Sequence, residues 1–349
     1  MFKFFIILFL LKYQCFLFAQ YNFNDSTLLS YYSSKNIQTI SVSISTEKQK
    51  QVQHPDKIYT LDSLGNLINL IDYKNDSNYT VTKNLYNKYN SIIQTTYYNN
   101  NRKDYTVTYT YNNIQLLVKK TAVKSNGNLK FSEEYVWNKE AVLVAQKFTN
   151  QKGMITEKLF KYNIDEYGNI TQKTIMDKNN KLITVEFYEY DTSRNKIALG
   201  ILAEKKGKII ISNWEYNDQN QLIKLSNYSN EGVLQTTHTY HYKDSLITTE
   251  MIKDHQENTV YLIEKKYNNQ NQLTSDFGKY ELDNYLDYKY TITYNNKGKE
   301  KFITVYDEND KIKNRIRFTY DKKGNKICEK YYKGKRNWIK TINFTLTYY

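Results

Sequence analysis

The histidines, the paired carboxylates and the cysteines are the residues whose chemistry could support catalysis or metal binding in this chain. His238 and His241 form its only close histidine pair, but three residues apart on a strand they point to opposite faces, which is poor geometry for one metal ion. The adjacent Glu133 and Glu134 face opposite ways for the same reason and cannot form a general acid and base pair. Cys328 lies in a strand-like stretch, which favours a packing role.

No short motif supports a catalytic hypothesis. Residues 307–310 (DEND) resemble the start of a calcium loop, but Ile312 and Phe318 stand where such a loop needs Gly and Glu, so a simple turn is favoured. The chain contains no phosphate-binding Gly-rich loop, no dinucleotide fingerprint, no nucleophile elbow and no Cys/His cluster. We predict that the protein is not an enzyme and needs no cofactor or metal.

Aromatic and basic residues are the remaining candidates, and they point to binding. Tryptophan rings can stack on sugars or bases, yet aromatic residues recur throughout the chain, which favours a role in holding a sheet together. Basic residues are densest near the C-terminus, where an anionic partner would dock. The candidate binding residues are Trp137, Trp214, Trp338, Lys330, Lys333, Lys335 and Arg336.

The composition indicates a protein built of β-strands. The 349 residues include 36 Tyr, 11 Gly and one Pro, a profile typical of strands joined by Asn-rich turns. The formal net charge of +14 could attract nucleic acid, anionic lipid or acidic polysaccharide. Lysines scattered over turns and outward strand positions are more simply explained as keeping a long sheet soluble, so we expect no nucleic-acid partner.

The first 19 residues resemble an export signal. Lys3 supplies a positive start, residues 4–11 an apolar core, and Ala19 a small residue suited to cleavage. An uncleaved membrane anchor is the alternative, but Lys12 interrupts the apolar run and leaves it short for a bilayer. We expect an exported protein in the periplasm, at the outer-membrane surface or outside the cell, with Cys328 as its only cysteine.

One turn signal recurs through most of the chain. It consists of an anchor residue, Asn or Asp, two free positions, Gly or Asn, and then an aliphatic residue, as in residues 216–222 (YNDQNQL). Asn or Asp favours the first position of a type I turn, and Gly or Asn tolerates the left-handed position that ends it. The anchors are Leu61, Tyr86, Tyr111, Trp137, Ile164, Tyr190, Tyr216, Tyr242, Tyr267, Tyr294 and Tyr320, at intervals of 25 to 27 residues. So steady a period indicates a repeat architecture.

A second turn halfway through each repeat makes each repeat one β-hairpin. The strands alternate as a hairpin requires: in residues 105–111 (YTVTYTY) tyrosine and valine share one face and threonine the other. The predicted fold is all-β, an antiparallel meander of about eleven 26-residue hairpins over residues 57–349. Because strand twist accumulates, we expect the meander to coil into a superhelical ribbon or a spiral shell, with a stacked sandwich as a further option.

The two ends of this array would be unprotected sheet edges. Residues 20–56 form an N-terminal lead-in with a strand over residues 37–45, and we expect it to cover the first edge. The last strand, residues 339–349, has no obvious cap. We expect it to be an exposed edge, to pair with another copy of the chain, or to pair with the lead-in.

The turn segments at residues 61–67 (LDSLGNL), 164–170 (IDEYGNI) and 320–327 (YDKKGNKI) resemble the tyrosine–aspartate (YD) repeats of Rhs proteins and teneurins, particularly the divergent Asn-rich versions in secreted proteins of Bacteroidota. The resemblance implies long hairpin sheets that wind into a shell or spiral for encapsulation, display or contact. Asn66, Asn169 and Asn325 replace the Arg that commonly follows the turn Gly in that family. No autoprotease region or toxin-like domain is recognisable, so a role in toxin delivery does not carry over.

Two functions follow as expectations. The first is an exported, non-enzymatic scaffold or binding surface at the cell envelope, which presents an aromatic-rich, basic sheet to a glycan or an envelope protein. The second is an outer-membrane β-barrel of about 22 strands, the number that the hairpins would supply. Self-association through an edge strand is a further expectation.

Overall fold

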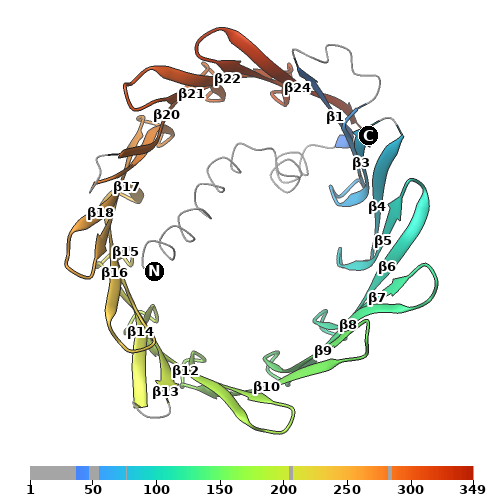
Figure 1. Cartoon of the computed structure of the whole chain (residues 1–349), viewed down its shortest axis with the longest axis vertical. Helices are drawn as coiled ribbons and strands as arrows, with labels where there is room; N and C mark the ends of the chain where they lie inside the picture. Colours follow the sequence, from blue (N-terminus) through green and yellow to red (C-terminus); the bar gives the residue numbers. More distant parts are fainter. Residues whose placement is uncertain (1–36, 47–54, 76, 204–206, 282–284, 349) are drawn as a thin grey trace. The chain divides into compact units, whose positions relative to one another are not determined.

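The computed structural model describes residues 37–46, 55–75, 77–203, 207–281 and 285–348, and all regular structure in them is β-strand (Figure 1). The expected export signal and the first part of the lead-in therefore lie outside the described residues. The chain divides into two compact units. Unit 1 comprises residues 1–107, 319–328 and 341–349, and unit 2 comprises residues 108–318 and 329–340. The described part of the chain contains no helix long and apolar enough to cross a membrane.

The strands follow one another along the chain as consecutive hairpins. Those that begin in unit 1 are β1 (Ile37–Thr46), β2 (Lys57–Leu61), β3 (Leu67–Asn75), β4 (Asn78–Tyr86), β5 (Ile92–Asn99), β6 (Arg102–Tyr111) and β23 (Lys326–Lys333). Those that begin in unit 2 are β7 (Leu117–Lys124), β8 (Leu129–Trp137), β9 (Leu143–Asn150), β10 (Ile155–Ile164), β11 (Ile170–Asp177), β12 (Leu182–Tyr190), β13 (Lys196–Ala203), β14 (Gly207–Tyr216), β15 (Leu222–Tyr228), β16 (Leu234–Lys243), β17 (Leu246–Asp254), β18 (Thr259–Tyr267), β19 (Leu273–Tyr280), β20 (Tyr285–Tyr294), β21 (Glu300–Tyr306), β22 (Ile312–Tyr320) and β24 (Asn337–Tyr348). In unit 2 each strand pairs antiparallel with the next, as β8, β9 and β10 show in green in Figure 1. The predicted all-β class is confirmed, and consecutive strands pair in antiparallel order.

The sheet is closed, which corrects the predicted open ribbon or spiral shell. In unit 1, β1 pairs antiparallel with β2, and it also pairs with β24. Because β1 has a partner on each side, the sheet of 24 described strands has no free edge and is closed by its strand pairing. The repeat pattern specifies which neighbours pair along the chain, but twist and stagger summed over all strands decide whether the last strand meets the first. Of the three expectations for the C-terminal strand, pairing with the lead-in is confirmed.

The turn chemistry agrees with the sequence in detail. At the fourth residue after most anchors the backbone φ is positive, as at Gly65 (84°), Asn90 (61°), Gly168 (86°) and Asn220 (58°). Gln115, Ala141 and Arg194 adopt the same conformation, although residues of these types rarely do. The repeat therefore determines the backbone conformation at this position more strongly than the residue type does.

The turn aspartate explains the Asn that departs from the YD pattern. Asp62 Oδ1 accepts hydrogen bonds from the backbone N–H groups of Leu64 and Asn66, both at 2.9 Å. The side-chain amide of Asn66 then donates to Asp62 Oδ2, also at 2.9 Å. The pair Asp165 and Asn169 repeats this arrangement. The Asn after the turn Gly therefore uses the second oxygen of the turn carboxylate and locks the turn.

The anchor side chains join successive repeats. Many tyrosine and tryptophan anchors donate a hydrogen bond back to the carbonyl of the aliphatic residue that starts a strand in the previous repeat. These bonds are Tyr86 to Leu67 (2.9 Å), Trp137 to Leu117 (2.8 Å), Tyr190 to Ile170 (3.0 Å), Tyr242 to Leu222 (2.8 Å), Tyr267 to Ile247 (2.9 Å) and Tyr294 to Leu273 (2.8 Å). Phenol and indole serve equally because each offers one donor at the end of a flat ring.

Candidate functional site

Unit 2 contains a series of buried or half-buried carboxylate–tyrosine pairs on its sheet. We call the face on which Tyr135, Tyr162, Tyr188, Tyr261 and Tyr290 lie the tyrosine face; the opposite face is the threonine face. Cross-strand partners share a face, so the strand register assigns each side chain to one of the two. The pairs hold ionisable groups where surrounding rings exclude water.

In the first type of pair a carboxylate precedes a tyrosine by two residues on the same strand. Tyr135 donates its hydroxyl to Glu133, Tyr188 donates to Glu186 at 2.5 Å, and Tyr331 donates to Glu329 at 2.7 Å. Residues two apart on a strand point to the same face, so the spacing brings hydroxyl and carboxylate together.

The register adds a lysine to two of these pairs. Lys120 lies opposite Glu133 with Nζ 3.4 Å from Oε1, and Lys173 lies opposite Glu186 with Nζ 3.3 Å from Oε2. The lysines and glutamates are only 20% to 28% exposed, so water screens these ion pairs less than surface pairs. In each trio the lysine neutralises the charge of the glutamate, and the tyrosine donates a hydrogen bond to the same carboxylate.

In the second type of pair an aspartate serves two tyrosines. Asp276 on β19 is 5% exposed, and it accepts hydrogen bonds from Tyr288 (3.0 Å) and Tyr290 (3.1 Å) on β20. Burial raises the pKa of Asp276, against the opposing effect of Lys265. Gly278 is required beside it, because a Cβ there would stand 2.5 Å from both the Tyr261 hydroxyl and the Tyr288 ring.

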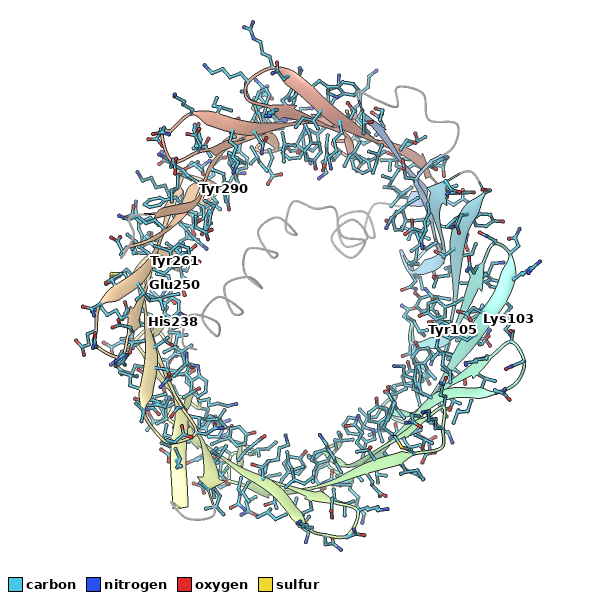
Figure 2. The ribbon with its side chains drawn as sticks, viewed as in Figure 1. Lys103, Tyr105, His238, Glu250, Tyr261 and Tyr290 are labelled. Atoms are coloured by element: carbon cyan, nitrogen blue, oxygen red, sulfur yellow. The ribbon has the colours of Figure 1, made fainter. Side chains whose placement is uncertain are left out.

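Neighbouring strands extend this cluster. On β18, Tyr261 donates to Asp287 Oδ2 at 2.7 Å and stacks edge-on against Tyr280 with ring centroids 4.9 Å apart. On β16 and β17, His238 Nδ1 lies 3.1 Å from Glu250 Oε1. Figure 2 labels His238, Glu250, Tyr261 and Tyr290 on this stretch of the sheet.

The electrostatics make these tyrosines donors, not bases. Burial, followed by the hydrogen bond to Glu133, raises the pKa of Tyr135 to about 12, and burial also raises the pKa of Tyr188 and Tyr261. A phenol with a raised pKa stays protonated at neutral pH and holds the carboxylate beside it. Among the described residues no group of three His, Cys, Asp or Glu could hold a metal ion. The arrangement is chemically suited to fixing side chains across strands.

The structure does not bring the sequence-predicted tryptophans together. Trp137 lies on β8, Trp214 on β14 and Trp338 on β24, so no two of them are on neighbouring strands. Trp137 donates its indole N–H to Leu117, which makes it an anchor like the tyrosines. Trp214 lies on the tyrosine face opposite Leu225.

The basic residues predicted to bind a partner lie in one short segment of the chain. Lys330, Lys333, Lys335 and Arg336 are exposed, at the end of β23 and in the turn that leads to β24. Nothing described beside them shapes a binding surface, so their role in binding stays a prediction.

The histidines and adjacent glutamates behave as their spacing indicated. His238 pairs with Glu250 on the tyrosine face, whereas His241, an odd number of residues away, faces the other side. Glu133 pairs with Lys120 and Glu134 with Lys119, on opposite faces. Sequence reasoning missed the carboxylate–tyrosine pairs, although a Glu followed two residues later by Tyr is visible at residues 133, 186 and 329.

Comparison with known proteins gives only distant similarity. No protein-family model matches the chain, and no curated protein matches it. Among solved structures it is similar to the TcdB2-TccC3 complex without its hypervariable C-terminal region, at 10% identity over 79% of this chain and 22% of that one, with a TM-score of 0.21.

It is also similar to a porin-like protein from Bacteroides uniformis, at 13% identity over 90% of this chain and 98% of that one, with a TM-score of 0.22. A porin-like protein from Bacteroides vulgatus shows 8% identity over 81% of this chain and 98% of that one, with a TM-score of 0.18. The chain spans about a quarter of the length of the TcdB2-TccC3 chains. Membership of the YD-repeat family stays a prediction from the turn segments.

Proposed function

We propose that the chain is an exported, non-enzymatic β-barrel of the cell envelope that offers a rigid wall for binding. The observation that carries the proposal is the pairing of β1 with both β2 and β24. A closed sheet has no free edge, so it resists edge-to-edge aggregation without disulfides. A closed barrel is therefore better supported than an open display sheet, and the described strands number 24 instead of about 22.

The side chains on both faces favour a barrel wall in water. A membrane-spanning barrel needs an apolar band on its lipid face, and a lysine at the bilayer midplane costs about 2–4 kcal/mol. In unit 2 the tyrosine face carries the ion pairs of Lys120 and Lys173, and the threonine face carries Lys119 at 2.9 Å from Glu134. We therefore infer attachment at the surface of the outer membrane or a free periplasmic barrel, with insertion into the bilayer as the second candidate.

Fractionation of the native host tests this proposal. We expect the protein, cleaved after Ala19, either in the soluble periplasmic fraction or in the envelope fraction with release to the supernatant by alkaline carbonate. A chain deleted of residues 1–19 is the matched control and should stay in the cytoplasm. Retention in the carbonate pellet alongside an integral outer-membrane marker would establish the second candidate instead. Recovery of the full chain in the cytoplasm would overturn export altogether.

A further inference from the structure

One end of the unit 2 sheet carries a row of exposed aliphatic side chains. Consecutive strands run antiparallel, so the second turns of the repeats lie at one end of the sheet and the anchor turns lie at the other. At the second-turn end, apolar residues in or next to four successive turns between β9 and β16 are 43% to 64% exposed. We call them the apolar rim: Met154, Ile155, Leu182, Ile183, Leu202 and Val233.

Side-chain caps fix the turns that carry the first part of the apolar rim. Asn150 Oδ1 accepts hydrogen bonds from the backbone N–H groups of Lys152 (2.9 Å) and Met154 (3.1 Å). Asp177 Oδ1 accepts the backbone N–H of Lys181 at 2.9 Å. These local bonds hold the turn backbone, so the apolar rim presents its side chains from defined positions.

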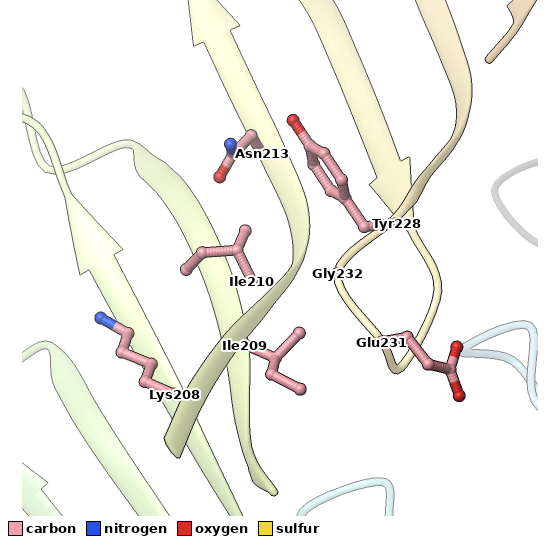
Figure 3. A pocket seen from close by; sticks show the side chains of 7 residues that line it. All are labelled: Lys208, Ile209, Ile210, Asn213, Tyr228, Glu231 and Gly232. Carbon is pink, nitrogen blue, oxygen red and sulfur yellow. The ribbon is translucent and has the colours of Figure 1, made fainter. Parts of the chain in front are cut away.

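The last part of the apolar rim lies in the turn between β15 and β16, which Figure 3 shows beside the start of β14. A Cβ at Gly232 would stand 3.4 Å from the Ile209 side chain, so this turn packs closely on the neighbouring strand. Ile209 is buried, whereas Val233, the residue that follows Gly232 in the turn, is exposed. The turn therefore covers one aliphatic side chain of β14 and leaves another facing solvent.

Lysines lie among the residues of the apolar rim. Lys152, Lys178 and Lys181 are exposed in the β9–β10 and β11–β12 turns, and none of them forms an ion pair with another residue in the part of the chain that the structure describes. Residues 150–154 and 177–181 contain one carboxylate, Asp177, which is engaged as a turn cap. Three positive charges against one negative make this stretch basic.

Other second turns at the same end of the sheet have the opposite character. Residues 254–258 (DHQEN) contain two carboxylates and no lysine, and residues 307–311 (DENDK) contain three carboxylates and one lysine. Thr259 and Ile312, which begin the strands after these turns, are half-buried, whereas Ile155 and Leu182 at the matching positions are exposed. Exposed aliphatic residues and basic charge therefore occur together on one stretch of this end.

Aliphatic side chains flanked by lysines suit the surface of an anionic bilayer. The aliphatic groups can enter the boundary between the lipid head groups and the acyl chains, while the lysine ammonium groups stay beside the phosphates. A protein partner is less favoured by this composition. Protein interfaces are depleted in lysine and draw most of their binding energy from Trp, Tyr and Arg, and the apolar rim contains none of these three.

We propose that the apolar rim docks this protein on the surface of a membrane that contains anionic phospholipid. The inference rests on the proposed envelope location and deepens it by naming the part of the sheet that meets lipid. Contact through turns leaves both faces of the sheet in water, as the ion pairs of Lys120 with Glu133 and of Lys119 with Glu134 on opposite faces require.

Sedimentation with vesicles tests the docking. The protein is the purified chain from residue 20 onward, because the expected export signal precedes all described strands and its apolar core would bind lipid by itself. The probes are vesicles of phosphatidylethanolamine with phosphatidylglycerol, and vesicles of phosphatidylcholine as the uncharged comparison. We expect binding to the anionic vesicles, weaker binding to the uncharged ones, and release from the anionic vesicles at high salt. The outcome does not depend on where fractionation of the host places the chain.

Two double variants separate the apolar contribution from the charge contribution. Ile155→Ser with Leu182→Ser should weaken binding to the anionic vesicles about tenfold or more, because two inserted side chains become polar. Lys152→Gln with Lys181→Gln should weaken binding by about fivefold for each lysine and should reduce the effect of salt. Circular dichroism checks that every variant keeps its sheet.

The opposite end of the same sheet supplies the matched control. Ile114 and Tyr167 are as exposed as the apolar rim, but they lie in anchor turns, and residues 112–116 and 165–169 contain no lysine. Ile114→Ser with Tyr167→Ser should leave vesicle binding unchanged.

Three outcomes would overturn the proposal. They are absence of sedimentation with anionic vesicles, equal binding to both kinds of vesicle, and equal loss of binding in the control variant and in Ile155→Ser with Leu182→Ser. Absence of vesicle binding together with a change of oligomeric state in Ile155→Ser with Leu182→Ser would also overturn it, and would assign the apolar rim to contact between copies of the chain.

Discussion

The closing seam of unit 1 and the repeat array of unit 2 hold their strands together in different ways. The closing seam comprises β1, β2 and residues 341–348 of β24, and its most deeply buried side chains are large and mainly apolar: Ile40, Tyr59 and Leu61 are 0% exposed. The array of unit 2 relies on polar ties, namely the anchor hydrogen bonds and the carboxylate–tyrosine pairs. A repeated sequence can encode a repeated polar tie, whereas the closing seam occurs once and depends on side chains found only there.

Deletion of residues 337–349 should have the largest effect, because it removes one side of the closing seam. With β24 absent, β1 and β23 each keep one partner and expose an edge, so we expect self-association by light scattering. A comparison variant deletes residues 190–215, one whole repeat from anchor to anchor, and should self-associate less because both strands of the seam remain. A monomeric 337–349 deletion would contradict the importance of closure.

Truncation inside the closing seam should have the next largest effect. Ile40→Ala removes a side chain that is 0% exposed opposite Tyr59, and should lower the free energy of unfolding by about 2–5 kcal/mol. The control Ile155→Ala changes a side chain that is 49% exposed in the array, and should change the stability by less than about 0.5 kcal/mol. Urea unfolding followed by circular dichroism measures both, and similar shifts would erase the contrast between seam and array.

The polar ties of the array should be individually weaker. Tyr188→Phe, Glu186→Gln and the double variant form a cycle whose coupling free energy we expect to be about 1–2 kcal/mol, because the bond joins a phenol to a charged carboxylate. Tyr89→Phe, at a ring that is 56% exposed in a turn, is the control and should leave the stability unchanged. Additive effects of the two substitutions would show that the pair contributes no tie.

The smallest expected effects are on the pH dependence of stability. The contributions of Asp276 and Asp165 should change with pH in opposite directions. Burial raises the pKa of Asp276, so the folded state holds the proton more tightly than the unfolded chain, whose value is about 3.9. Stability should therefore fall as pH rises through the window between about 3.9 and the raised value, and Asp276→Asn should abolish that fall.

At Asp165 the hydrogen bond from the Asn169 side chain lowers the pKa. Its contribution is present above about 3.9 and should be lost as pH falls through the lowered value. Carbon-13 spectra of the carboxyl groups would measure both titrations. A lower pKa at Asp276 than at Asp165 would contradict the assignment of a buried tie and an exposed turn.

The candidate site was only partly visible in the sequence. A Glu and a Tyr two residues apart share a strand face by simple alternation, so the Glu186 to Tyr188 pair could have been predicted. The lysine on the neighbouring strand that pairs with this glutamate could not have been predicted. Register shifts at the anchors, as between Asn163 and Ile164, change which residues face one another across strands.

The amino-acid sequence by itself determined the strands, both turns of each repeat and the antiparallel order of the hairpins. These features rest on contacts within a few residues: an Asx side chain bonding the turn ahead of it, a left-handed residue, and period-two alternation. Only the tertiary structure decided that β24 meets β1 and that the sheet closes. Closure depends on small twists and staggers added over every strand, a sum that no local segment encodes.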